Sequence, residues 1–118
     1  MKEKLTINPA IWLHREGAHV SYLLRASDGK RCCLGIYLQD NCGISPDLLQ
    51  GQGSPRQLPK SIRETLPDWL SCLSDNNTPL VERLMAANDI PTTGERVARL
   101  DISSLFAEVG VEVEFTEE

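Results

Sequence analysis

The chain has 118 residues, 41% of them hydrophobic, and a formal net charge of −5. This length suits one domain with a single modest core, and we expect residues 1–118 to form one. No apolar run approaches the roughly 20 residues that a membrane-spanning helix needs, which excludes a membrane protein of that kind. Residues 1–9 contain no apolar stretch of a secretory signal, so we expect a cytoplasmic protein with reduced cysteines.

The acidity is concentrated at the C-terminal end. Residues 1–99 hold all twelve Lys and Arg against eleven Asp and Glu, whereas residues 100–118 hold six acids and no base. Nucleic-acid binders take much of their affinity from Lys and Arg on phosphates, so this polarity disfavours a nucleic-acid partner. Two interpretations of the acidic end stay open: a solvated strand face with a polar tail, or an acidic patch that binds a basic protein surface.

The N-terminal segment predicts a short helix. Asn8 is a good N-cap and Pro9 a good first helical residue, so we expect a helix from Pro9 to about Glu16. His14 would then be an exposed helix residue. An additional strand over residues 4–7 is an open alternative.

A hairpin and a helix are predicted next. Asp28-Gly29 lies between apolar runs and tolerates the positive φ of a tight turn, which predicts strands near 20–25 and 30–33. Apolar side chains then follow helical spacing over 34–42, and Gly43 suits the left-handed residue after a helix. Gly35 lies inside this helix, so we expect another backbone to approach closely there.

Residues 44–57 predict the longest loop, with one helical turn at 46–49. Long loops in compact domains often carry function, and this one is a candidate recognition element through Gln50, Gln52 and Arg56. The Gly-rich part, residues 51–53, lacks the Lys-Ser/Thr ending of a phosphate-binding loop. No cofactor is predicted from this or any other motif.

The second half of the chain predicts further helices and one strand. Short helices are expected over 59–66 and 68–73, and a longer one from Pro79 to Asp89 is expected to be the most buried. Asn88 and Asp89 suit hydrogen bonding at the end of that helix.

A capping box at Thr92 and Glu95 predicts the start of a last helix. It carries Val97 and Leu100 and then, with an optional break at Asp101, Leu105, Phe106 and Val109. Residues 111–115 then alternate as a strand with Glu112 and Glu114 pointing to solvent.

These elements predict an α+β fold. A small antiparallel sheet would combine the hairpin at about 20–33 with the C-terminal strand 111–115, and four or five short helices would cover one face.

The cysteines and histidines do not follow a metal-binding spacing. His14 and His19 match one half of a zinc pattern, but the cysteines are adjacent or far apart, at Cys32, Cys33, Cys42 and Cys72. Buried, reduced thiols are the favoured interpretation, with zinc binding or redox chemistry as alternatives. Cys32 and Cys33 would point to opposite faces if extended, so we expect one of them, with Leu34, in the core.

Three motifs resemble those of small uncharacterised proteins encoded by bacteriophages and prophages. They are the "YL…DGKxCCLG" pattern at residues 22–35, "LMxxND" at residues 84–89 and "LFxxxG[IV]xVEF" at residues 105–115. The resemblance spans roughly residues 12–115. It implies a phage-type accessory protein that acts in a bacterial cytoplasm, and it implies no particular chemistry.

The leading hypothesis for function is protein binding, for instance inhibition of a host defence or metabolic enzyme. The contact residues would be acidic, or would come from the 44–57 loop; they are Glu112, Glu114, Glu117, Glu118, Gln50, Gln52 and Arg56. The first alternative is a small enzyme or metal-assisted hydrolase that uses the cysteines and histidines. A second alternative is a regulatory nucleic-acid binder that uses Arg25, Lys30, Arg31 and Arg56.

Overall fold

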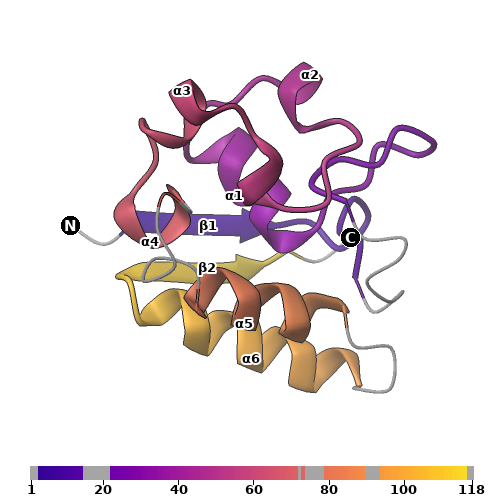
Figure 1. Ribbon diagram of the computed structural model, residues 1–118. Helices are drawn as coiled ribbons and strands as arrows, with labels where there is room; N and C mark the ends of the chain where they lie inside the picture. The colour runs from indigo at the N-terminus through magenta and orange to yellow at the C-terminus, as the bar shows by residue number, and fades with distance from the viewer. Residues whose placement is uncertain (1–2, 15–21, 72, 74–78, 90–93, 117–118) are drawn as a thin grey trace.

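The first and last segments of the chain form the sheet. The computed structural model describes residues 3–14, 22–71, 73, 79–89 and 94–116 (Figure 1). In these residues the sheet has two strands, β1 (Glu3–Ile7) and β2 (Val111–Phe115), which are parallel. Glu3 aligns with Val111 and Ile7 with Phe115. The additional strand over residues 4–7 therefore exists, and it is the partner of the C-terminal strand.

The predicted antiparallel sheet is wrong, because residues 22–25 and 30–33 do not pair as strands of a hairpin. The turn itself forms: the Arg25 N–H donates to the Lys30 carbonyl at 2.8 Å, and Asp28 Oδ1 accepts from the Lys30 N–H at 3.1 Å. Beyond the turn each arm forms an isolated bridge elsewhere, Leu24 with Gln50 and Arg31 with Trp12. Local turn chemistry was read correctly, but tertiary contacts decided the pairing.

The helix predicted from Pro9 is also wrong over its described residues, 9–14. The chain makes one turn, in which the Ile11 N–H donates to the Asn8 carbonyl at 3.0 Å. The Leu13 N–H then donates to Arg31 at 2.7 Å, so the segment is extended against its neighbour. Glu16 lies outside the described residues, as do Cys72, Thr92, Glu117, Glu118 and His19.

Six α-helices and one 3₁₀ helix occur in the described residues, more than the four or five expected. They are α1 (Cys33–Asp40), α2 (Pro46–Leu49), η2 (Pro55–Gln57), α3 (Lys60–Arg63), α4 (Asp68–Ser71), α5 (Pro79–Asp89) and α6 (Glu95–Ala107). The helix expected over 34–42 and the turn expected at 46–49 are confirmed as α1 and α2. In Figure 1, α1 lies beside β1, and α5 and α6 lie on the side of β2.

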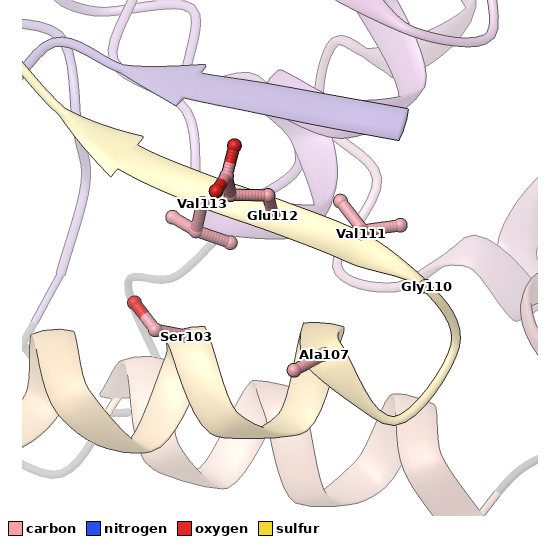
Figure 2. A pocket seen from close by; sticks show the side chains of 6 residues that line it. All are labelled: Ser103, Ala107, Gly110, Val111, Glu112 and Val113. Carbon is pink, nitrogen blue, oxygen red and sulfur yellow. The ribbon is translucent and has the colours of Figure 1, made fainter. Parts of the chain in front are cut away.

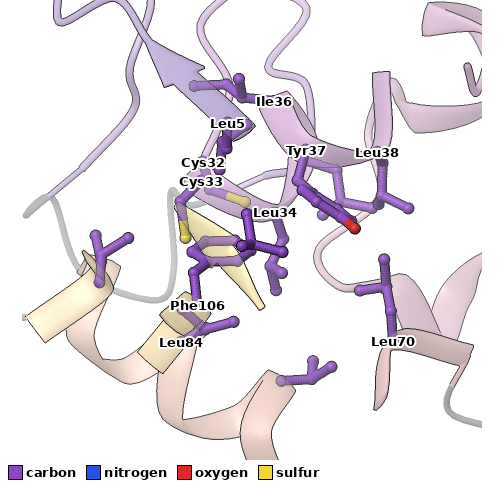
Figure 3. Packing of buried hydrophobic residues seen from close by; sticks show 14 of the residues in the cluster. Leu5, Cys32, Cys33, Leu34, Ile36, Tyr37, Leu38, Leu70, Leu84 and Phe106 are labelled. Atoms are coloured by element: carbon purple, nitrogen blue, oxygen red, sulfur yellow. The ribbon is translucent and has the colours of Figure 1, made fainter. Parts of the chain in front are cut away.

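The core forms around α1, in which residues 33–38 are all buried. Figure 3 shows Leu34 beside Phe106 of α6, with Leu84 of α5 close to that ring. The expectation that α5 would be the most buried helix is wrong: the first six residues of α1 are buried on every side, whereas α5 exposes one polar face.

The glycine inside α1 explains how tightly the chain packs there. A Cβ atom built on Gly35 would lie 1.8 Å from the Leu23 carbonyl oxygen, far inside van der Waals contact. The predicted close approach of another backbone is therefore confirmed. No residue with a side chain fits at this crossing without moving the Leu23 segment.

The last helix, α6, buries only some of the apolar residues that the sequence places on it. Its inward residues are Ala98, Ile102, Leu105 and Phe106, while Val97 and Leu100 are 50% and 61% exposed. The helix runs through Asp101 without the break considered from sequence. Among the described residues no helix has the length and apolar character that would carry it across a membrane.

Candidate protein-binding surface

The solvent face of the two-stranded sheet carries the acidic residues singled out from sequence. Val111 is buried and Val113 and Phe115 are partly buried, while Glu112 and Glu114 are exposed between them. The predicted alternation of β2 is therefore confirmed. On β1 the same face shows Lys4 and Thr6, which align with the two glutamates; we call Lys4, Thr6, Glu112 and Glu114 the outer face.

One ion pair forms on the outer face. Lys4 Nζ lies 3.3 Å from Glu114 Oε1, and both side chains are about half exposed, at 52% and 56%. Such an exposed pair contributes at most about 1 kcal/mol, because water and salt screen it. Within the described part of the chain, Glu112 has no ion pair. The outer face therefore has two carboxylates and one ammonium group.

Glu3, at the start of β1, shows how an acid in the same sheet takes a structural role instead. Its carboxylate accepts from the Tyr37 hydroxyl at 2.8 Å and from Asn41 Nδ2 at 3.1 Å, which ties β1 to α1 and to the residue after it. Burial and this carboxylate raise the pKa of Tyr37. Glu3 is thus engaged in the fold, whereas Glu112 makes no such contact with the other described residues.

The 44–57 segment is not an open loop. It contains α2 and η2, and it buries Ile44, Leu49 and Pro55. Its backbone is also hydrogen-bonded to the arm that precedes the Asp28 turn. The Leu23 N–H donates to the Gln52 carbonyl at 2.8 Å, and the Gly51 N–H donates to Leu24 at 3.1 Å. Its side chains nevertheless reach solvent: Gln50 and Arg56 are exposed and Gln52 is half-buried.

The structure does not bring all of the predicted contact residues together. Glu112 and Glu114 lie on β2, whereas α2 and the segment after it lie on the far side of α1 from that strand (Figure 1). A small partner surface that covers the outer face would therefore not also contact Gln50, Gln52 or Arg56. We therefore take the outer face and the 44–57 segment as two separate surfaces.

The thiols at the start of α1 are buried in the core rather than placed in a site. Cys32 and Cys33 are 4% and 1% exposed, and both sulfurs lie within the packed cluster of Figure 3. Burial raises the pKa of Cys32 to about 12 and raises that of Cys33 well above its usual value. The expectation that one of the two would point inward is replaced by burial of both, because the chain turns into α1 there. Neither is a thiolate near neutral pH.

The remaining metal and nucleophile candidates are also accounted for in the described residues. Cys42 is partly buried, and desolvation raises its pKa to about 11. The His14 ring stacks on Trp12 with a centroid distance of 3.7 Å and lies 2.9 Å from the Trp12 carbonyl oxygen. It is a partly buried packing residue, not the exposed helix residue expected. In the described part of the chain no three His, Cys, Asp or Glu residues form a metal-binding group.

Two of the four basic residues of the nucleic-acid alternative, Arg25 and Arg31, are engaged with neighbouring side chains. Arg25 Nη2 lies 2.6 Å from Asp28 Oδ2, and that contact and the Lys30 N–H lower the pKa of Asp28 to about 2. Arg31 donates to Gln39 and lies 3.9 Å from Asp40. Because these charges are partly compensated within the protein, they form a poor phosphate-binding cluster.

Two features could not be predicted from the sequence: the place of Lys4 on the outer face and the long-range partners of the buried Asn88. Lys4 was not connected with the acidic strand, and no local signal could connect them, because residues 4 and 114 meet only through the fold. Asn88 was expected to bond at its own helix end, but it makes long-range hydrogen bonds to Trp12, Leu13 and Cys33. The role predicted for Asn88 was structural, and its actual partners are structural too.

Comparisons with protein families, with curated proteins and with solved structures give no match for this chain.

Proposed function

We propose that this chain acts by binding a protein partner that presents a basic surface, and that the outer face of the sheet makes the contact. The observation that carries the proposal is the pair of exposed carboxylates on β2, Glu112 and Glu114. Among the residues that the structure describes, only Glu114 has a cation beside it. Complementary charge guides association and selects partners more than it adds affinity.

The setting that fits this mode of action is that of a phage-type accessory protein. The three sequence motifs support a phage or prophage origin, and inhibition of a host defence or metabolic enzyme is one form that stoichiometric binding takes. The buried, protonated thiols weigh against the alternative of a cysteine-based enzyme, because a thiol nucleophile must be accessible and ionised.

The proposal is tested by removing the two charges while keeping the shape of the side chains. A tagged chain is used to capture a partner from bacterial lysate, and association with the purified partner is then followed at about 50 and 500 mM salt. The double variant Glu112→Gln/Glu114→Gln should associate several-fold more slowly at low salt. The difference should fade at high salt, where the Debye length falls from roughly 14 to 4 Å.

Two controls make the test specific. Glu64→Gln/Glu82→Gln changes the net charge by the same amount at exposed positions outside the sheet, and should associate like the unmodified chain. Lys4→Gln removes the only cation of the outer face and should speed association. The proposal fails if both double variants behave alike, or if neither changes the rate or its salt dependence.

A further inference from the structure

The strand β2 has one edge that faces away from β1. In a parallel ladder, alternate residues of a strand bond to the neighbouring strand and the others point outward. The Glu3 N–H donates to the Gly110 carbonyl at 3.3 Å, and the Thr116 N–H donates to the Ile7 carbonyl at 2.9 Å. With this register, Val113 and Phe115 direct their backbone N–H and C=O groups to the outer edge.

These outward groups have no backbone partner among the residues that the structure describes. An unpaired strand edge is a template for another strand, because each N–H and C=O there still needs a hydrogen-bond partner. Val111 is buried, while Val113 and Phe115 are partly exposed. The accessible stretch of the edge therefore runs from Val113 to Phe115.

A groove lies beside the first part of β2 and reaches this stretch at Val113. It has a volume of about 210 Å³ and is lined by the strand and by α6, through Ser103, Ala107, Gly110, Val111, Glu112 and Val113. Figure 2 shows the short Ser103 and Ala107 side chains of α6 directed toward the strand. Because both are small, space for further side chains remains between helix and strand.

We propose that this edge binds an extended segment of the protein partner as an added β-strand, with basic and apolar residues in alternation. The proposal rests on the function proposed above and specifies how the partner binds. An added strand would place alternate side chains beside Glu112 and Glu114, where Lys or Arg fits, and the others over the groove.

The charge on this strand selects that occupant over a second copy of the chain. Two copies paired edge to edge through β2 would bring four carboxylates together, two from each strand, and like charges opposed across strands are destabilising. A basic segment meets the same two carboxylates as counter-charges. The geometry therefore favours a different, basic chain.

The test uses a defined probe, acetyl-Lys-Val-Lys-Val-Lys-amide, and nuclear magnetic resonance of the intact protein. Binding should shift the amide signals of Val113 and Phe115 and slow their hydrogen exchange. Val113→Pro removes an outward N–H and no ladder bond, so it should weaken probe binding at least tenfold. Val113→Thr keeps that N–H and nearly the same shape, and should bind the probe like the unmodified chain.

A probe methylated on its central backbone nitrogens tests the same hydrogen bonds without altering the protein, which covers the case in which Val113→Pro fails to fold. The unmodified protein should bind this methylated probe at least tenfold more weakly than the plain probe. Strand addition is overturned if the methylated probe binds as well as the plain one, or if the shifts lie away from β2. If Val113→Pro binds the captured partner normally while Glu112→Gln/Glu114→Gln does not, strand addition fails and the proposed function stands. If neither variant changes binding, both fail.

Discussion

Asn88 connects three segments of the chain at one buried point. Its Oδ1 accepts from Trp12 Nε1 at 2.8 Å and from the Cys33 N–H at 3.1 Å, and its Nδ2 donates to the Leu13 carbonyl at 2.9 Å. The side chain also donates to Asp89 and is fully buried. Every donor and acceptor of this amide is thus used, which is the condition under which a buried polar group is tolerated. The contact to Cys33 satisfies one of the N–H groups that the first turn of α1 leaves without a partner.

Replacing this amide should therefore be costly. Asn88→Ala would leave the Trp12 and Cys33 donors buried without an acceptor, at about 1–3 kcal/mol for each unsatisfied group. We expect the free energy of unfolding in urea to fall by about 2–6 kcal/mol. Ala86→Ser, at an exposed position of the same helix, is the control and should stay within about 0.5 kcal/mol.

A cycle with Trp12→Phe separates the indole bond from the others. Each single variant and the double variant are unfolded, and the coupling should be about 1 kcal/mol, the net value of one hydrogen bond. Additive effects would mean that the Trp12–Asn88 bond contributes nothing to the stability of the folded protein.

At the level of single elements, α1 and the segment before the Asp28 turn lie in close backbone contact. Gly35 allows the Leu23 backbone to lie against the helix, and the Cys32 N–H donates to the Tyr22 carbonyl at 3.2 Å beside it. The segment then pairs with residues 50–52. The position of α1 and that of the 44–57 segment are both set by this crossing.

Gly35→Ala should disrupt this crossing. The added methyl would overlap the Leu23 carbonyl, and since the obstacle is backbone, relief requires separation of the two segments. We expect a loss of about 3 kcal/mol or more, at the upper end for overpacked sites, by chemical denaturation. Gly53→Ala introduces the same methyl where its nearest neighbour is a side-chain atom at 3.6 Å, and should change stability little. Equal effects of the two substitutions would contradict the close approach.

The elements that sequence predicted well are those with a local cause. The 34–42 helix, the turn at 46–49 and the alternation of 111–115 follow from spacing and capping within a few residues. The close approach at Gly35 could be predicted because a glycine inside a helix is destabilising unless another backbone packs against it. The helix from Pro9 failed because good capping residues could not outweigh the bonds that the segment forms with Arg31.

At the scale of the whole molecule, the sheet joins a strand near the start of the sequence to a strand near its end. Pairing of residues 3–7 with residues 111–115 has no local signature, because strand partners are chosen by packing of the faces and not by distance in sequence. The same limit applies to the candidate site: the two glutamates on the outer face were predicted, but Lys4, the open edge and the groove were not.

Removal of β1 should therefore unfold the whole molecule and not leave the remaining residues folded. A chain that begins at Pro9 loses Leu5 and Ile7, both fully buried, and β2 loses its strand partner. Two core side chains at about 2–5 kcal/mol each approach the whole stability of a small domain. We expect no cooperative thermal transition by circular dichroism, and recovery of one when a peptide of residues 1–8 is added in excess.

The control for the truncation is Thr6→Ala in the full chain, which alters the outer face alone and should melt within a few degrees of the unmodified protein. A truncated chain that melts cooperatively near the same temperature would show that the sheet is dispensable.

The parallel pairing of the terminal strands also determines how the molecule resists force. Because β1 begins and β2 ends at opposite ends of the sheet, tension applied to the two termini pulls the strands lengthwise past each other (Figure 1). The ladder hydrogen bonds are then loaded in shear and must break together, whereas in a hairpin pulled at its open end they would break one after another. An unfolding motor that pulls on one terminus of a chain held at the other would meet this sheet as its first mechanical barrier.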